Sequence, residues 1–200
     1  MIDDLDRTIE ALLRHELPAS LANVAITFAT PDDEFPPQSV TPPAIDVFLY
    51  DIRENRELRS NEWLLERRSD GTAAKEPPPL RIECSYLVTA WASESTPTPA
   101  QDEHKLLGEA MRALVRYSTL PDELLQGELA GQEPPLPATA IQPGHLQSVA
   151  EFWQALGGKP RAAFTYSVTI GMSPVDAAEA GPLVREKVLQ LKQIDGSSSS

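Results

Sequence analysis

Residues 77–92, PPPLRIECSYLVTAWA, contain the longest strand-like pattern in the chain and decide the predicted fold. Apolar side chains alternate with Arg81, Glu83 and Ser85, which is the period-two pattern of a half-buried strand. Three prolines open the stretch and stiffen the chain that enters it. At ~3.3 Å per residue, a strand over residues 80–91 would span about 40 Å. We therefore predict a long strand at 80–91.

The elements around this strand are predicted from the same periodicities. Alternating apolar residues indicate further strands at 22–29, 44–50 and 162–172, with a short one at 138–141. Apolar residues at spacings of three and four indicate helices at 2–17, 101–117 and 146–156. The stretch 183–191, LVREKVLQL, fits a strand and a helix equally. Because strands alternate with helices, we expect an α/β fold of the α+β type, a mixed β-sheet flanked by two to three helices.

A run of mixed charge follows the strand predicted at 44–50. Residues 51–68 hold five acidic and five basic side chains, and Asp70-Gly71 is a hairpin-turn signal. Residues 62–68 and 72–75 are therefore predicted to form the two sides of a polar hairpin arm. Composition alone fits a solvated loop as well as a docking surface, because surface ion pairs contribute only about 0–1 kcal/mol each.

The arginines of this run favour the docking interpretation. Arginine pairs with carboxylates through two hydrogen bonds and is enriched at protein interfaces. The charged residues at 51–68 are therefore a candidate docking surface, with the solvated loop as the alternative.

Length and charge limit the domain organisation and the partners. The 200 residues fit one domain, predicted at 1–195 with residues 51–79 as a projecting loop and hairpin, and with 196–200 as a disordered tail. The net charge of −13 disfavours nucleic acid, whose affinity for proteins depends on Lys and Arg. No apolar stretch approaches the ~20 residues that cross a bilayer. We expect no membrane insertion by this chain and assembly in the cytoplasm.

Residues that could bind metals or act as nucleophiles lack the surroundings that such chemistry needs. The three histidines, His15, His104 and His145, are scattered, whereas zinc sites need several ligands at defined spacing. Cys84 lies in the strand predicted at 80–91, where a free cysteine usually serves as a small apolar core residue. We therefore expect no metal, no cofactor and no catalysis. A hydrolase that uses Asp102 and His104 remains as an alternative.

Five segments, taken in order, resemble a known family. They are LYDIRENRELR (49–59), the hairpin around Asp70-Gly71, PPPLRIECSYLVTAWA (77–92), DEHKLLGEAMRALVRY (102–117) and EFWQALGGKPRAAFTYSVTI (151–170). Together they resemble the cap, or tail-terminator, subunits of extracellular contractile injection systems, which are phage-tail-like particles of the antifeeding-prophage and virulence-cassette type. The resemblance covers roughly residues 1–190 and rests on pattern and order, not on a catalytic motif.

The resemblance implies a fold, a function, partners and interface residues. The charged loop and hairpin of the family match residues 53–68 and 70–75 here, so the resemblance implies ring or tube contacts at ten residues: Arg53, Glu54, Arg56, Glu57, Arg59, Glu62, Glu66, Arg67, Arg68 and Asp70. Members of this family are similar to phage tail terminators, with a mixed sheet flanked by helices. The implied function is a ring of identical copies, expected to be a hexamer, that ends the inner tube and anchors the last sheath layer. The implied partners are further copies of this chain, the inner tube protein and the sheath protein, first in the cytoplasm and then in the particle. An adaptor or tail-completion subunit of a phage or baseplate assembly is the alternative.

Overall fold

The computed structural model of the chain describes residues 1–60, 64–67, 72–93, 95–142, 149–173 and 178–182. The chain separates into two compact units. The larger unit comprises Met1–Arg59 and Leu80–Met172, and the smaller unit comprises Ser60–Pro79 and Ser173–Ser200. The single domain expected at 1–195 stays a prediction. Among the described residues there is no helix with the length and apolar character needed to span a bilayer.

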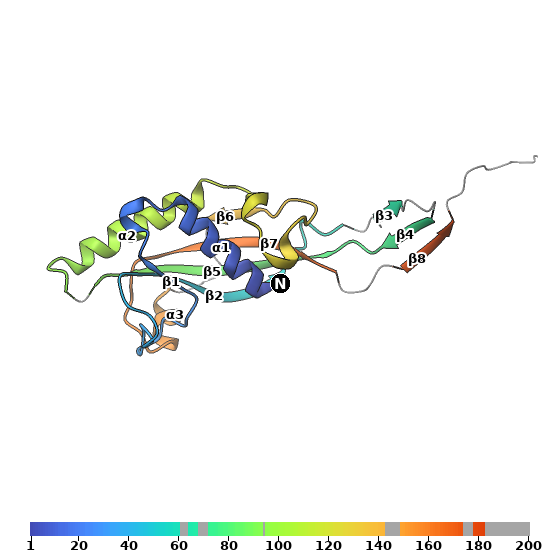
Figure 1. The fold of residues 1–200 in the computed structure, drawn as a ribbon. Coiled ribbons are helices and arrows are strands. Elements are labelled where there is room, and N and C mark those ends of the chain that lie inside the picture. Colours follow the sequence, from blue (N-terminus) through green and yellow to red (C-terminus); the bar gives the residue numbers. More distant parts are fainter. Residues whose placement is uncertain (61–63, 68–71, 94, 143–148, 174–177, 183–200) are drawn as a thin grey trace, which may run out of the picture. The chain divides into compact units, whose positions relative to one another are not determined.

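A five-stranded mixed sheet forms the centre of the larger unit (Figure 1). Its strands are β1 (Ala25–Thr27), β2 (Ala44–Glu54), β5 (Leu80–Trp91), β6 (Ala138–Ala140) and β7 (Ala163–Met172). Their order across the sheet is β1-β2-β5-β7-β6, with β1 parallel to β2 and the other neighbours antiparallel. The strand predicted at 80–91 is therefore the central strand of the sheet, and the predicted mixed sheet is confirmed.

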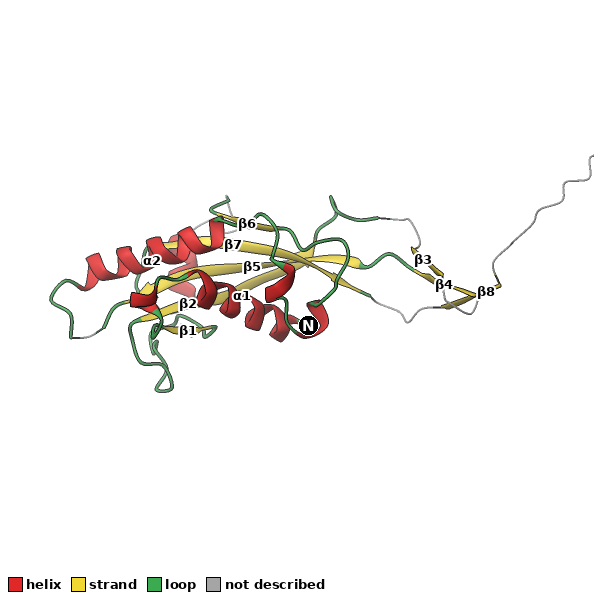
Figure 2. Ribbon diagram, turned by 45° about the horizontal axis from the view of Figure 1, so that its top comes forward, coloured by secondary structure: helices red, strands yellow, loops and turns green. Residues whose placement is uncertain are grey.

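Two helices cover one face of this sheet and a third lies on the other face (Figures 1 and 2). They are α1 (Ile2–Glu16), α2 (Pro99–Val115) and α3 (Val149–Ala155). Between the sheet and the first two helices lies an aliphatic core, which includes Leu5, Leu12, Ile45, Val88 and Leu114. Burial of such side chains supplies about 25 cal/mol per Å² of apolar surface, so this layer stabilises the unit.

The face that carries α3 is more aromatic. The Phe152 ring lies 6.3 Å from the Phe48 ring and 6.0 Å from the Tyr50 ring, both on β2. Trp153 is fully buried, at 1% exposure. Gly157 ends the helix in the left-handed region, at φ 71°, where glycine is strongly favoured. The neighbouring Gly158 N–H donates to the Trp153 carbonyl at 3.1 Å, which closes the helix end.

Strand β2 is longer than predicted, because it runs to Glu54 and not to Tyr50. The sequence prediction ended at the first charged residues. Pairing with β5 nevertheless continues through a register shift between Leu49 and Asp51, and it places Ile52 opposite Cys84. Backbone hydrogen bonds to β5 do not depend on side-chain polarity, so charged residues continue the strand where one face reaches solvent.

The smaller unit contains a separate three-stranded antiparallel sheet. Its strands are β3 (Leu64–Arg67), β4 (Thr72–Glu76) and β8 (Ala178–Pro182), in the order β3-β4-β8. The predicted hairpin pairing is confirmed, because Leu64 lies opposite Glu76 and Arg67 opposite Ala73. Strand β8 was not predicted, since its sequence AEAGP has no β-branched or aromatic residue. The ambiguous stretch 183–191 and the tail at 196–200 lie outside the described residues.

Candidate assembly surface

The charged segment, defined here as residues 51–59, lies at the end of β2 in the larger unit. The Arg53 Nε donates to the Asp51 carboxylate at 2.6 Å. Two more arginines share one carboxylate: Arg56 Nε lies 3.9 Å and Arg59 Nη1 lies 3.5 Å from oxygens of Glu54. The Arg56 side chain is 85% exposed. Ion pairs this exposed add little to folding stability, so these guanidinium groups can exchange partners at low cost.

Asn55 holds the base of the charged segment. Its side-chain amide donates to Thr169 Oγ1 at 3.3 Å and to Glu83 Oε2 at 3.4 Å, both on neighbouring strands of the sheet. Its side-chain oxygen accepts from the Leu58 N–H at 3.2 Å, and its own N–H donates to the Arg81 carbonyl at 2.7 Å. The turn after β2 is therefore attached to the sheet, although its charged side chains reach solvent.

Two large apolar side chains are exposed within the charged segment. Ile52 is 49% exposed and Leu58 is 46% exposed. Strand β1 pairs only with residues 44–46 of β2. Beyond Asp46, no residue that the structure describes pairs with the outer edge of β2. Among the described residues, the backbone of this edge therefore has no strand partner, and it lies beside exposed apolar and charged side chains.

The ten predicted interface residues are divided between the two units and the positions outside the described residues. Arg53, Glu54, Arg56, Glu57 and Arg59 lie together in the charged segment. Glu66 and Arg67 lie on β3 of the smaller unit, opposite Ala74 and Ala73. Glu62, Arg68 and Asp70 lie outside the described residues. The interface role of all ten residues stays a prediction.

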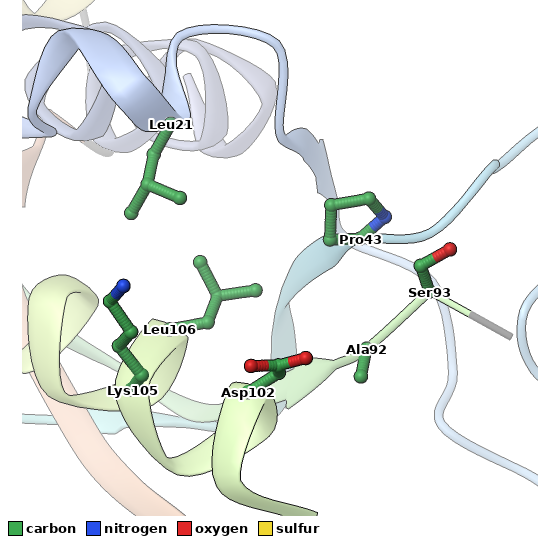
Figure 3. Close-up of a pocket in the computed structure, with 7 residues that line it drawn as sticks. All are labelled: Leu21, Pro43, Ala92, Ser93, Asp102, Lys105 and Leu106. Carbon is green, nitrogen blue, oxygen red and sulfur yellow. The ribbon is translucent and has the colours of Figure 1, made fainter. Parts of the chain in front are cut away.

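A surface pocket that the sequence did not indicate lies at the opposite end of β2. It has a volume of about 210 Å³. Its lining comes from four places in the chain: Leu21, Pro43, Ala92 with Ser93, and the α2 residues Asp102, Lys105 and Leu106. Figure 3 shows the Leu21 and Leu106 side chains pointing toward each other from opposite walls. We call this cavity the α2 pocket. No local pattern could have revealed it, because its lining is assembled only when the chain folds.

The hydrolase alternative gains no support from the side chains it requires. Asp102 and His104 are both exposed on α2, and the Asp102 carboxylate accepts a hydrogen bond from the Thr96 hydroxyl. Within the described part of the chain, no group of three or more His, Cys, Asp or Glu side chains could hold a metal ion. Cys84 is fully buried, and burial raises its pKa to about 11, which disfavours the thiolate that a nucleophile requires.

Asp46 is a buried acidic residue on β2. Its side chain is 0% exposed, and neither carboxylate oxygen has a well-formed hydrogen bond to a described residue. Burial raises its pKa to about 8, although weaker interactions with the Ala29 and Val47 N–H groups and the Thr89 hydroxyl favour the charged form. The carboxyl group is therefore mostly protonated at neutral pH.

Asp4 has the opposite environment. It lies on the buried side of α1 and accepts hydrogen bonds from the Arg7 guanidinium and from the Glu128 N–H, the latter at 3.2 Å. The amino group of Met1, 2.8 Å away, and Arg7 lower its pKa to about 2. Gly127 has a φ of 55°, and a Cβ there would lie 2.0 Å from Asp4 Oδ1. This contact joins α1 to the loop that follows α2, so we interpret Asp4 as structural.

The chain is similar to known proteins over almost its whole length. A family model, the Pvc16 N-terminal domain, matches residues 4–186. A comparison with curated proteins gave no match. One solved structure is the sheath/tube terminator, in the extended state, of the extracellular contractile injection system PVC. It is 26% identical, has a TM-score of 0.69, and the match covers 99% of this chain and 65% of that chain.

A second solved structure is the tube-terminating cap of the anti-feeding prophage. It is 25% identical, has a TM-score of 0.65, and the match covers 96% of this chain and 61% of that chain. The chain therefore spans less than two thirds of the length of either protein. The predicted resemblance to the cap family of contractile injection systems is confirmed, as is the predicted α+β fold. With residues 4–186 matched, this chain belongs to the Pvc16 N-terminal domain family.

Proposed function

We propose that this chain is a structural subunit that ends the inner tube of a contractile injection particle. In this proposal, identical copies form a ring, a hexamer, that stops tube growth and anchors the last sheath layer. The observation that carries the proposal is the similarity of 99% and 96% of the chain to terminators of two such particles. The proposed partners are other copies of the chain, the inner tube protein and the sheath protein.

The surface of the larger unit supports a role in assembly. A closed ring requires heterologous contacts, in which one surface of a copy meets a different surface of the next copy. The charged segment supplies side chains of both signs on a base that Asn55 attaches to the sheet. Charges of both signs give such contacts register and specificity. The net charge of −13 also favours protein partners over nucleic acid.

The proposed role is structural and needs no catalysis. Both similar structures are described as terminators, and the Asp102 and His104 side chains of the hydrolase alternative are separately exposed to solvent. We propose that the chain assembles in the cytoplasm and then remains in the particle.

The test compares particles made with and without this chain. In its absence, we expect tubes of uncontrolled length and sheath that detaches from one end in electron micrographs. Re-expression of the chain should restore both features, and a label on the chain should mark one end of each particle. Labels along the whole tube, or particles with normal length and attached sheath after deletion, would refute the proposal. Co-purification with capsid proteins would instead support a phage tail-completion role.

A further inference from the structure

We propose that Leu58 of one copy inserts into the α2 pocket of the next copy, with Glu57 facing Lys105 and Arg59 facing Asp102. This inference rests on the ring proposed above and deepens it by naming the two surfaces that meet. The occupant of the α2 pocket is thus a second copy of this chain.

The α2 pocket has the chemistry of a site for an aliphatic side chain. Leu21, Pro43, Ala92 and Leu106 give it apolar walls, while Asp102 and Lys105 provide one negative and one positive group on α2 (Figure 3). Its volume of about 210 Å³ accommodates a branched aliphatic side chain. Interfaces commonly centre on such an apolar anchor in a pocket, with polar groups at the rim.

The turn that carries Leu58 matches this pattern. Leu58 is 46% exposed and lies between Glu57 and Arg59, which are both exposed. The turn is therefore complementary to the pocket. Its apolar side chain meets apolar walls, its acid meets the base on α2, and its base meets the acid on α2. The hydrogen bond from the Leu58 N–H to Asn55 holds the turn, at 3.2 Å. A turn that is already held in place loses less conformational entropy when it binds.

Leu58 and the α2 pocket cannot meet within one copy. Pro43 of the pocket directly precedes β2, and Leu58 follows its other end. The strand rises ~3.3 Å per residue, so residues 44 and 54 lie about 30 Å apart. Both surfaces belong to the larger unit and are joined by its sheet. Two complementary surfaces at opposite ends of one strand suit a head-to-tail contact, which closes a ring when the rotation between copies permits.

The other large apolar side chains that the structure describes as exposed fit the pocket less well. Ile52 also lies between opposite charges, but Asp51 and Arg53 pair with each other at 2.6 Å. Val115 lies on α2, the same helix that forms one wall of the pocket. Ile141 has no charged residue on either side of it. Among the described residues, Leu58 therefore fits best, because the contact of its neighbour Arg59 with Glu54, at 3.5 Å, is longer than the pair between Asp51 and Arg53.

Disulfide cross-linking tests the contact directly. The only native cysteine, Cys84, is fully buried, so introduced cysteines are the accessible thiols. We expect Leu58→Cys combined with Ser93→Cys to give a ladder of covalent oligomers after oxidation of assembled particles, lost on reduction. Each single variant should give no ladder, and neither should Val115→Cys combined with Ser93→Cys. If the double variant gives no ladder, the inference is overturned.

The outcome separates the inference from the proposed function. Particles with normal tube length and the chain at one end, but without the ladder, would overturn the Leu58 contact and leave the terminator role intact. A charge exchange provides a second measurement that needs no disulfide geometry. Glu57→Lys and Lys105→Glu should each weaken self-association about threefold, and their combination should restore it. Failure of the combination to restore self-association would also contradict the contact.

Discussion

The two halves of β2 differ in burial although both belong to one strand and both pair with β5. Residues 44–47 are all 0% exposed, whereas Ile52 is 49% exposed and the Arg53 side chain is 40% exposed. Pairing with β5 continues along both halves, from Ala44 to Glu54. Only the first half also pairs with β1, and both of its faces are covered. Backbone pairing therefore sets the length of the strand, while the covering layers decide which half stabilises the fold and which half can bind.

The largest expected effect comes from truncating one isoleucine in each half. Ile45→Ala removes a fully buried side chain opposite Ala90, and we expect it to lower the free energy of unfolding by about 2–5 kcal/mol. Ile52→Ala makes the same chemical change opposite Cys84, and it should alter stability by no more than about 0.5 kcal/mol. Urea unfolding of both variants measures the difference. Equal losses would contradict the division of β2 into a core half and a surface half.

The buried half of β2 could be predicted from sequence and the exposed half could not. The apolar residues Ile45 and Val47 stand at alternate positions, and this period-two pattern indicates that one face of the strand is buried. The exposed half has no such signal, because Asp51, Arg53 and Glu54 are as common in loops as at a solvated strand end. Strand β8 also lacks a local signal, because it is a strand only through its pairing with β4, more than 100 residues away in the chain.

The candidate surface was predictable in part. The mixed charges of residues 51–59 stand out in the sequence, and the structure places them together at the end of β2. The α2 pocket had no local signal, since its lining residues Leu21, Ala92 and Leu106 come from distant segments. Asp46 did leave a signal, as the one acid in the otherwise apolar stretch AIDVFLY. Its burial depends on the segments that cover this face of the sheet, and the periodicity of the strand does not indicate them.

Asp46 allows the buried half to be tested by pH. Burial raises its folded-state pKa from 3.8 to about 8, so between these values the folded protein keeps a proton that the unfolded chain releases. The contribution of this group to stability is therefore full below about pH 4 and is lost as pH rises toward 8. Asp46→Asn keeps the shape and removes the titration. We expect the variant to gain about 4 kcal/mol relative to the wild type between pH 4 and pH 7.

Urea unfolding at several pH values measures this difference. Comparing the two proteins at each pH cancels the titration of all other groups, so the slope of the difference reports Asp46 alone. A constant difference across the range would mean that the carboxyl group has an ordinary pKa and that water reaches it in the folded protein.

The smallest expected effect on stability comes from the exposed half. Reversing two charges, Arg56→Glu with Arg59→Glu, places acids near Glu54, but these side chains are 85% and 57% exposed. Solvent screens such repulsion, so we expect the free energy of unfolding to change by no more than about 0.5 kcal/mol. Arg112→Glu with Lys159→Glu is a matched control, because it changes the net charge equally at exposed positions outside the charged segment. Only the first pair should reduce co-sedimentation of the chain with assembled tube. Loss of tube binding in both double variants would show that net charge matters and position does not, whereas retained binding in both would place the tube contacts elsewhere on the subunit.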